Sequence, residues 1–224
     1  MEGPIAWIYP DEFDITKDDT DTAIPAHGTC VLTRAIGIWG SSRSAAVTIG
    51  RLDTSTSYTQ RKARIEQQVL TLLIQILNEV IKNSLQKRAV VNFSVGWNGL
   101  DDPGLGAYPI GRASLWARQL YLVVKKLVAQ DVIFVTSAGN EGQADKTVID
   151  VPAIWATDIG FISTAATDSQ GVVWNEARYL PNKYWPNSGA NTWASGVDVV
   201  CPARSGNSDF LFQTGSSFCK LSSS

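Results

Sequence analysis

The sequence predicts a single α/β domain with a mostly parallel sheet and helices on both of its faces. Amphipathic helical segments alternate with short apolar strands over residues 61–136, which is the order of β-α-β crossovers. One of these strands, residues 132–136, is apolar almost throughout, as expected for a strand covered on both faces. The 224 residues, 44% hydrophobic and 18% charged, suit one folded domain, and no linker or repeat divides residues 1–224.

The first helix of this pattern is expected from Arg61 to Arg88. Its outer face carries Arg, Lys, Gln and Asn side chains, so the helix should pack its other face on the core. The apolar positions at helical spacing are Ile65, Val69, Leu72, Leu73, Ile76, Val80 and Ile81. A β-rich run at residues 89–94 follows directly and is ended by Gly96.

A second helix is expected around residues 113–130, ahead of the strand at 132–136 and the turn at Ala138-Gly139-Asn140. Its inner positions are Leu120, Val123, Val124, Leu127 and Val128. Short runs at 161–165 and 197–200 can add further strands. Residues 171–196 are rich in Asn, Gly, Ser, Trp and Pro and are interpreted as loop, as are the polar, acidic residues 1–26.

Charge and cysteine content limit the classes of partner and cofactor. The net charge is −2 and no basic block supplies the positive face that nucleic acid or an anionic membrane needs. No apolar run reaches the length of a membrane span, and the N-terminal residues lack the regions of a signal peptide. Cys30, Cys201 and Cys219 are too few and scattered for a disulfide framework or a CxxC metal site, and their odd number leaves one outside internal bridges. With one histidine, a catalytic metal is not expected.

Three short motifs carry candidate chemistry, and each has a structural alternative. His27, the single histidine, stands at the start of a plausible helix and can act as a general base, but a lone histidine more often has a structural or surface role. Asn140 lies where a buried strand ends, so its amide can donate to a developing oxyanion, or it can simply make a turn. Ser217 follows Gly215-Ser216, where a serine can sit exposed on a tight turn, or it can belong to a flexible Ser-rich tail.

In the order His, Asn, Ser, the three motifs resemble the subtilase (subtilisin-like) serine protease family, peptidase S8. His27-Gly28-Thr29 looks like the family's His-Gly-Thr motif, Asn140 falls at its Ala-Gly-Asn oxyanion position, and Gly215-Ser216-Ser217 looks like its Gly-Thr-Ser nucleophile motif. Segments 92–96, 151–153 and 197–203 resemble further family blocks. The similarity covers residues 27–217, and His-Gly-Thr-Cys-Val is most similar to the fungal branch.

The resemblance implies a subtilisin-like three-layer domain and a serine endopeptidase that acts on polypeptides by acyl transfer. Ser217 is then expected to attack the peptide carbonyl, His27 to move the proton and Asn140 to hold the oxyanion. Ser94, Val95 and Gly96 are expected to pair with the extended substrate. The family implies a monomer without a cofactor. Structural calcium occurs in many members, but no loop here identifies a site. A secreted or vacuolar location is compatible with the family, and the sequence itself assigns no compartment.

Two departures from the family pattern lead us to expect an incomplete domain. The family's triad runs Asp, His, Ser, and its aspartate stands in an Asp-Thr-Gly or Asp-Ser-Gly motif at a strand end. None of the aspartates that precede His27 stands in either motif. These aspartates are Asp11, Asp14, Asp18, Asp19 and Asp21. We therefore expect the catalytic aspartate and its strand upstream of Met1, and the family's long helix after the serine to be missing. A catalytically impaired fragment, a non-catalytic peptide-binding relic and a truncated gene product are the alternatives to an active protease.

Overall fold

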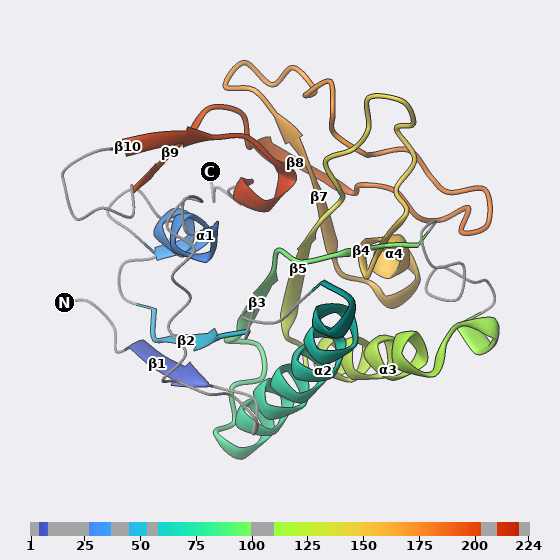
Figure 1. Ribbon diagram of the computed structural model, residues 1–224. Helices are drawn as coiled ribbons and strands as arrows, with labels where there is room; N and C mark the ends of the chain where they lie inside the picture. Colours follow the sequence, from blue (N-terminus) through green and yellow to red (C-terminus); the bar gives the residue numbers. More distant parts are fainter. Residues whose placement is uncertain are drawn as a thin grey trace.

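A four-stranded parallel sheet in the order β3-β5-β7-β8 lies at the centre of the fold (Figure 1). The computed structural model describes residues 5–8, 27–36, 45–52, 58–99, 110–202 and 210–219. The strands are β3 (Val90–Phe93), β5 (Ile133–Ser137), β7 (Ile162–Thr167) and β8 (Thr192–Ser195). The register pairs Val90 with Ile133, Val135 with Ile162 and Thr164 with Thr192. The predicted α/β class with a mostly parallel sheet is confirmed.

Within the described ranges, three smaller strand pairs accompany this sheet. They are the parallel pair β1 (Ile5–Ile8) and β2 (Val47–Gly50), and two antiparallel pairs, β4 (Trp97–Asn98) with β6 (Asp150–Val151) and β9 (Val199–Pro202) with β10 (Phe210–Gln213). The run predicted at 197–200 therefore forms a strand, but outside the parallel sheet. The loop predictions for 1–26 and 171–196 were wrong where β1 and β8 lie. Strands of four residues are too short for a clear period and gain their hydrogen bonds only from distant partners.

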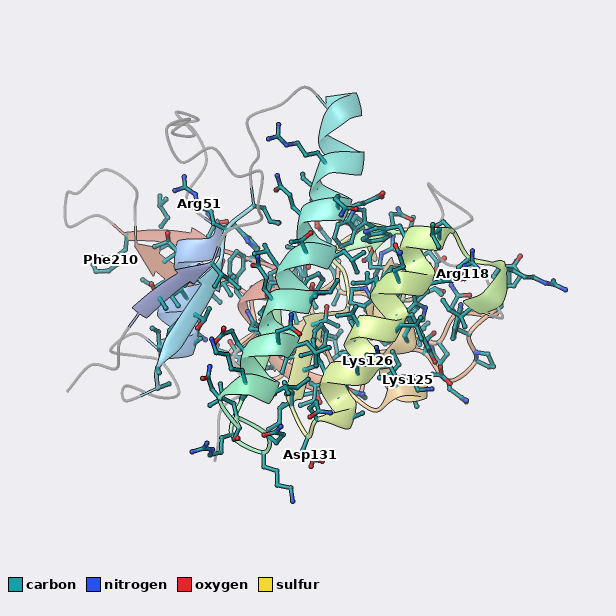
Figure 2. All side chains as sticks on the ribbon, turned by 90° about the horizontal axis from the view of Figure 1, so that it is seen from below. Arg51, Arg118, Lys125, Lys126, Asp131 and Phe210 are labelled. Carbon is teal, nitrogen blue, oxygen red and sulfur yellow. A yellow bond between two sulfur atoms is a disulfide. The ribbon has the colours of Figure 1, made fainter. Side chains whose placement is uncertain are left out.

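Two long helices, α2 (Tyr58–Lys82) and α3 (Leu115–Ala129), lie side by side on one face of the sheet (Figures 1 and 2). The inner positions of α3 are buried as predicted, with Leu120, Val124 and Leu127 all at 0% exposure, whereas Val128 is half-buried. Its outer side carries the exposed Arg118, Lys125 and Lys126, labelled in Figure 2. The shorter elements are α1 (His27–Ile36), α4 (Ala156–Ile159), η1 (Ile110–Arg112), η2 (Ala153–Trp155) and η3 (Ser216–Phe218).

The predicted first helix is too long at its C-terminal end, because a left-handed residue stops α2 at Lys82. Ser84 has a φ of 52°, Leu85 N–H donates to the Val80 carbonyl at 2.9 Å, and Ser84 N–H donates to the Ile81 carbonyl at 3.3 Å. This pair of bonds is a Schellman cap formed here without glycine. Ile81, predicted on the inner face, is 50% exposed.

The apolar core is divided into two clusters of unequal size. The main core lies between the sheet and α2 and α3, where the Phe134 ring contacts the rings of Phe93 and Phe161 with centroids 5.7 and 5.2 Å apart. A small second cluster, which we call the disulfide cluster, consists of Cys30, Val199, Cys201 and Phe218 with the half-buried Val31. It lies between α1 and the β9-β10 pair, on the side of the sheet away from α2 and α3 (Figure 1). Cys30 and Cys201 form a disulfide, and Cys219 stays a free thiol.

Candidate active site

Two of the motif segments lie at the carboxyl ends of central strands, as the sequence predicts for Asn140. The turn that carries Asn140 follows β5, and Ser94 follows β3. Both segments contact η3, the short helical turn that contains Ser217. Parallel strands end on the same edge of a sheet, so residues far apart in the sequence meet here.

Asn140 is fixed by hydrogen bonds to the residue that precedes Ser217. Its Oδ1 accepts from the Ser216 backbone N–H at 2.8 Å and from the Ser216 hydroxyl at 2.7 Å. The Ser216 Oγ in turn accepts from the Gly139 N–H at 3.3 Å. A backbone N–H can only donate, so the oxygen of the Asn140 amide must face Ser216 and its Nδ2 must face the other way. Within the described part of the chain, that Nδ2 and the Ser217 N–H donate to no protein group.

The turn before Asn140 depends on a glycine and on a buried arginine behind it. Gly139 has a φ of +115°, and a Cβ there would lie 2.7 Å from Arg178 Cδ and closer still to Asp150 Oδ2. Arg178 is 5% exposed, and its backbone N–H donates to the Gly139 carbonyl at 3.2 Å. Its Nη1 donates to the carbonyl of Thr147 at 2.9 Å and more weakly to that of Asp145. Its Nε lies 3.5 Å from the Glu141 carboxylate. Arg178 therefore supports the turn from inside, and nothing in its sequence context predicts its burial.

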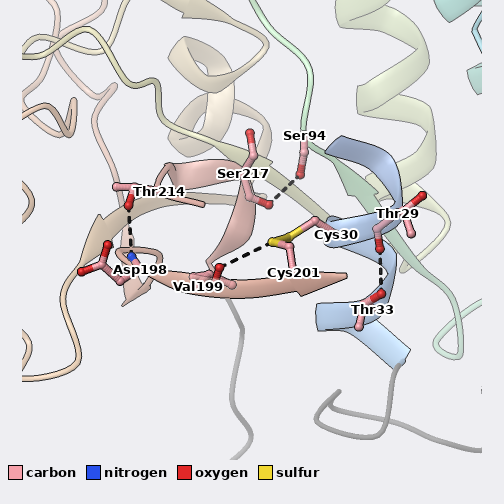
Figure 3. The surroundings of a disulfide bond; sticks show 9 residues. All are labelled: Thr29, Cys30, Thr33, Ser94, Asp198, Val199, Cys201, Thr214 and Ser217. Carbon is pink, nitrogen blue, oxygen red and sulfur yellow. Dashed lines mark hydrogen bonds between the residues drawn. A yellow bond between two sulfur atoms is a disulfide. The ribbon is translucent and has the colours of Figure 1, made fainter. Parts of the chain in front are cut away.

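Ser217 is half-buried in η3, and its backbone is tied to the segment that follows β3. The Ser94 hydroxyl donates to the Ser217 carbonyl at 3.3 Å (Figure 3) and accepts from Asn92 Nδ2 at 3.2 Å. Val95 is half-buried and Gly96 is exposed. A Cβ at Gly96 would lie 3.4 Å from Asp150 Cβ, in ordinary contact. The segment at residues 94–96 therefore lies beside the Ser217 turn, with Gly96 exposed to solvent.

His27 is the first residue of α1, so the predicted helix start is confirmed. Its ring packs on the Phe218 ring with centroids 5.2 Å apart and an interplanar angle of 55°. The side chain keeps solvent contact on one side, and desolvation by the surrounding protein lowers the pKa of His27 below its ordinary value. The neutral imidazole, the form that can accept a proton, is therefore favoured.

The structure places the His27 ring against Phe218, the residue that follows Ser217, but the side chains of His27 and Ser217 are not hydrogen-bonded to each other. Among the described residues, His27 makes no hydrogen bond to Ser217 or to a carboxylate. The aspartates considered before His27 (Asp11, Asp14, Asp18, Asp19 and Asp21) lie outside the described residues, as do residues 220–224. Catalytic hydrogen bonds in substrate-free sites are often long and shorten when substrate binds.

Two further properties of the described residues bear on cofactors and membranes. No group of three His, Cys, Asp or Glu side chains that could hold a metal ion occurs among them. No helix in the described part of the chain has the length and apolar character needed to cross a bilayer.

Comparison with known proteins identifies the family. The Subtilase family, peptidase S8, matches residues 10–223. No match was found among curated protein sequences. The fold is similar to that of the prenylagaramide maturation protease PagA (TM-score 0.58, 14% identity, 97% of this chain covered), of which the chain spans 64%. It is also similar to the self-cleaved protease domain of PatA (TM-score 0.57, 16% identity, 98% of this chain and 73% of that domain covered). With a family match over most of its length, this chain belongs to the subtilase family.

Proposed function

We propose that this chain is a serine endopeptidase domain that cleaves polypeptides by acyl transfer. The observation that carries the proposal is the orientation of Asn140, whose Oδ1 is held by Ser216, the residue before Ser217, so that its Nδ2 is left to donate. An amide held in this way is an oxyanion donor that needs no reorganisation when charge develops. Membership of the subtilase family makes peptide bonds the expected substrate class.

In the proposed reaction, the Ser217 hydroxyl oxygen attacks the carbonyl carbon of the scissile peptide bond. The His27 imidazole accepts the hydroxyl proton and then passes it to the leaving amine, which breaks the C–N bond and leaves an acyl-enzyme. Water, activated by the same imidazole, then hydrolyses the ester. At both stages the negative oxygen is bound by Asn140 Nδ2 and the Ser217 N–H. One such donor contributes a factor of about 10² to 10³ in kcat.

The segment Ser94, Val95 and Gly96 is the proposed binding strand for substrate. It extends from the end of β3, and its backbone adjoins the Ser217 turn through the Ser94 hydrogen bond. An extended peptide that adds to it as a further strand would present its carbonyl groups toward Ser217. Backbone pairing of this kind gives affinity with little dependence on side-chain identity.

Hydrolysis of a fluorogenic peptide library tests this proposal. We expect turnover by the wild-type chain and its complete loss in Ser217→Ala. Ser169→Ala, which alters an exposed serine that is not part of the motif, serves as the matched control and should retain full activity. Hydrolysis that survives in Ser217→Ala would exclude the proposed nucleophile.

A peptide-binding role without turnover is a second candidate, favoured by one observation. The Asn140 and Ser94 contacts are formed, whereas His27 is bonded neither to Ser217 nor to a described carboxylate. Under this alternative, calorimetry detects peptide binding to the wild-type chain, and mass spectrometry finds the peptide intact after prolonged incubation.

A further inference from the structure

The helix that carries His27 has a single buried anchor. Cys30, 1% exposed, is the one buried residue of α1, and the others are half-buried or exposed. Its partner Cys201 lies in β9 and is 0% exposed. Figure 3 shows the disulfide between the helix and the strand, with Ser217 and Ser94 close by. Through this bond, α1 is covalently tied to an element 171 residues away in the sequence.

The same anchor sets the direction of the His27 side chain. His27 and Cys30 are three residues apart in a helix, so their side chains lie on the same face. That face meets Phe218, which is 5% exposed and packs with Cys30, Val199 and Cys201 in the disulfide cluster. The His27 ring contacts the same Phe218 ring, with the centroids 5.2 Å apart. The disulfide cluster therefore holds the Phe218 ring, and this ring in turn fixes the position of the His27 imidazole.

The rest of the site is held by different contacts. Ser216 is bonded to Asn140, the Gly215 N–H donates to the Gly196 carbonyl at 2.8 Å, and Ser94 binds the Ser217 carbonyl. Cys219 Sγ donates to carbonyls of the main sheet. These contacts connect η3 to the ends of β3 and β5 and to β7 and β8, and they are separate from the packing of Phe218 on α1. Loss of the disulfide should therefore displace His27 and leave the Ser217 turn with its oxyanion donors in place.

We propose that the Cys30–Cys201 disulfide and Phe218 are positioning residues that set the imidazole of His27 against the Ser217 turn. This inference deepens the proposed function and makes proteolysis dependent on an oxidised disulfide. Opening it takes two electrons and two protons, which a dithiol such as dithiothreitol supplies while it closes to its own cyclic disulfide. The products are two free thiols, and among the described residues α1 then keeps its noncovalent packing on β9 and η3.

The single histidine of the chain allows a test that does not require activity. With labelled histidine, the protein gives one set of imidazole resonances, and the Phe218 ring shifts them from their positions in a disordered chain. We expect Cys30→Ser/Cys201→Ser to return these resonances toward unstructured positions while the main-core tryptophans, such as Trp155, keep their native fluorescence. Phe218→Leu, which keeps the disulfide and most of the volume, should remove the ring-current shift. Ser169→Ala, which alters an exposed serine outside the disulfide cluster, is the control and should change neither signal.

Kinetics on a peptide substrate supply the second readout. Displacement of a general base should lower kcat by about 10²-fold or more while KM changes little. If the double variant retains the native histidine resonances and kcat, or if KM rises at constant kcat, the inference is wrong. If the double variant does not fold, Phe218→Leu decides, since unchanged histidine resonances and unchanged kcat in that variant overturn the inference. A wild-type chain that shows no activity would contradict the proposed function but not the positioning role. The histidine resonances test that role, and they can be measured without turnover.

Discussion

Gly139 and Gly160 form a matched pair that separates backbone strain from crowding at the site. Both have positive φ, +115° and +90°, so an alanine at either is strained by about 1–3 kcal/mol. No atom lies within 4 Å of a Cβ at 160, whereas a Cβ at 139 meets Arg178 Cδ at 2.7 Å. Buried Arg178, held by the Thr147 carbonyl, cannot move aside. Overpacking of this kind adds about 1–3 kcal/mol.

We therefore predict that Gly160→Ala lowers the free energy of unfolding by about 1–3 kcal/mol and Gly139→Ala by about 2–6 kcal/mol. Urea unfolding followed by tryptophan fluorescence measures both. Gly139→Ala should also move Asn140 away from Ser216 and reduce labelling of Ser217 by a fluorophosphonate, whereas Gly160→Ala should not. Equal destabilisation by the two substitutions, or full labelling of folded Gly139→Ala, would refute this account of the turn.

Three further predictions concern single groups of the site. Asn140→Asp keeps the oxygen that binds Ser216 but replaces the donor, so kcat should fall at least about 10²-fold with native stability, and an unchanged kcat in steady-state assays would exclude the donor role. Because desolvation lowers the pKa of His27, the imidazole stays neutral down to a lower pH than a free histidine does. The acid limb of the pH profile of kcat/KM should therefore have its midpoint below about pH 6.5, and a midpoint above that value would contradict the role of His27 as the base. Burial raises the pKa of the Cys219 thiol to about 12, so at pH 8 iodoacetamide should modify the native chain about a thousandfold more slowly than the denatured chain, and equal rates would show an accessible thiolate.

The long elements of the fold could be predicted because their sequence patterns are strong. Several turns of amphipathic periodicity define α2 and α3, and apolar runs define β3 and β5. The end of α2 was missed because Ser84 takes the left-handed conformation that is usually filled by glycine. β1 and β8 were missed because four residues with one partner strand give no period to detect.

The sequence singled out the motif residues that the structure brings together, but not the residues that support them. Asn140 and Ser217 stand in short motifs that gain meaning only when taken in order with His27. Arg178 gave no signal, because a sequence does not reveal which arginine is buried behind a turn. The pairing of Cys30 with Cys201 over 171 residues likewise cannot be derived from spacing, since any two of three cysteines could bridge.

Reaction with a fluorophosphonate tests the central claim most directly, because the reagent modifies only a serine that is activated by its surroundings. The account predicts covalent labelling of the folded chain at Ser217, identified by peptide mass spectrometry. Labelling should be absent in Ser217→Ala and strongly reduced in His27→Ala, with Ser169→Ala unchanged. A folded chain that takes up no label, or a label that persists in Ser217→Ala, would contradict the account.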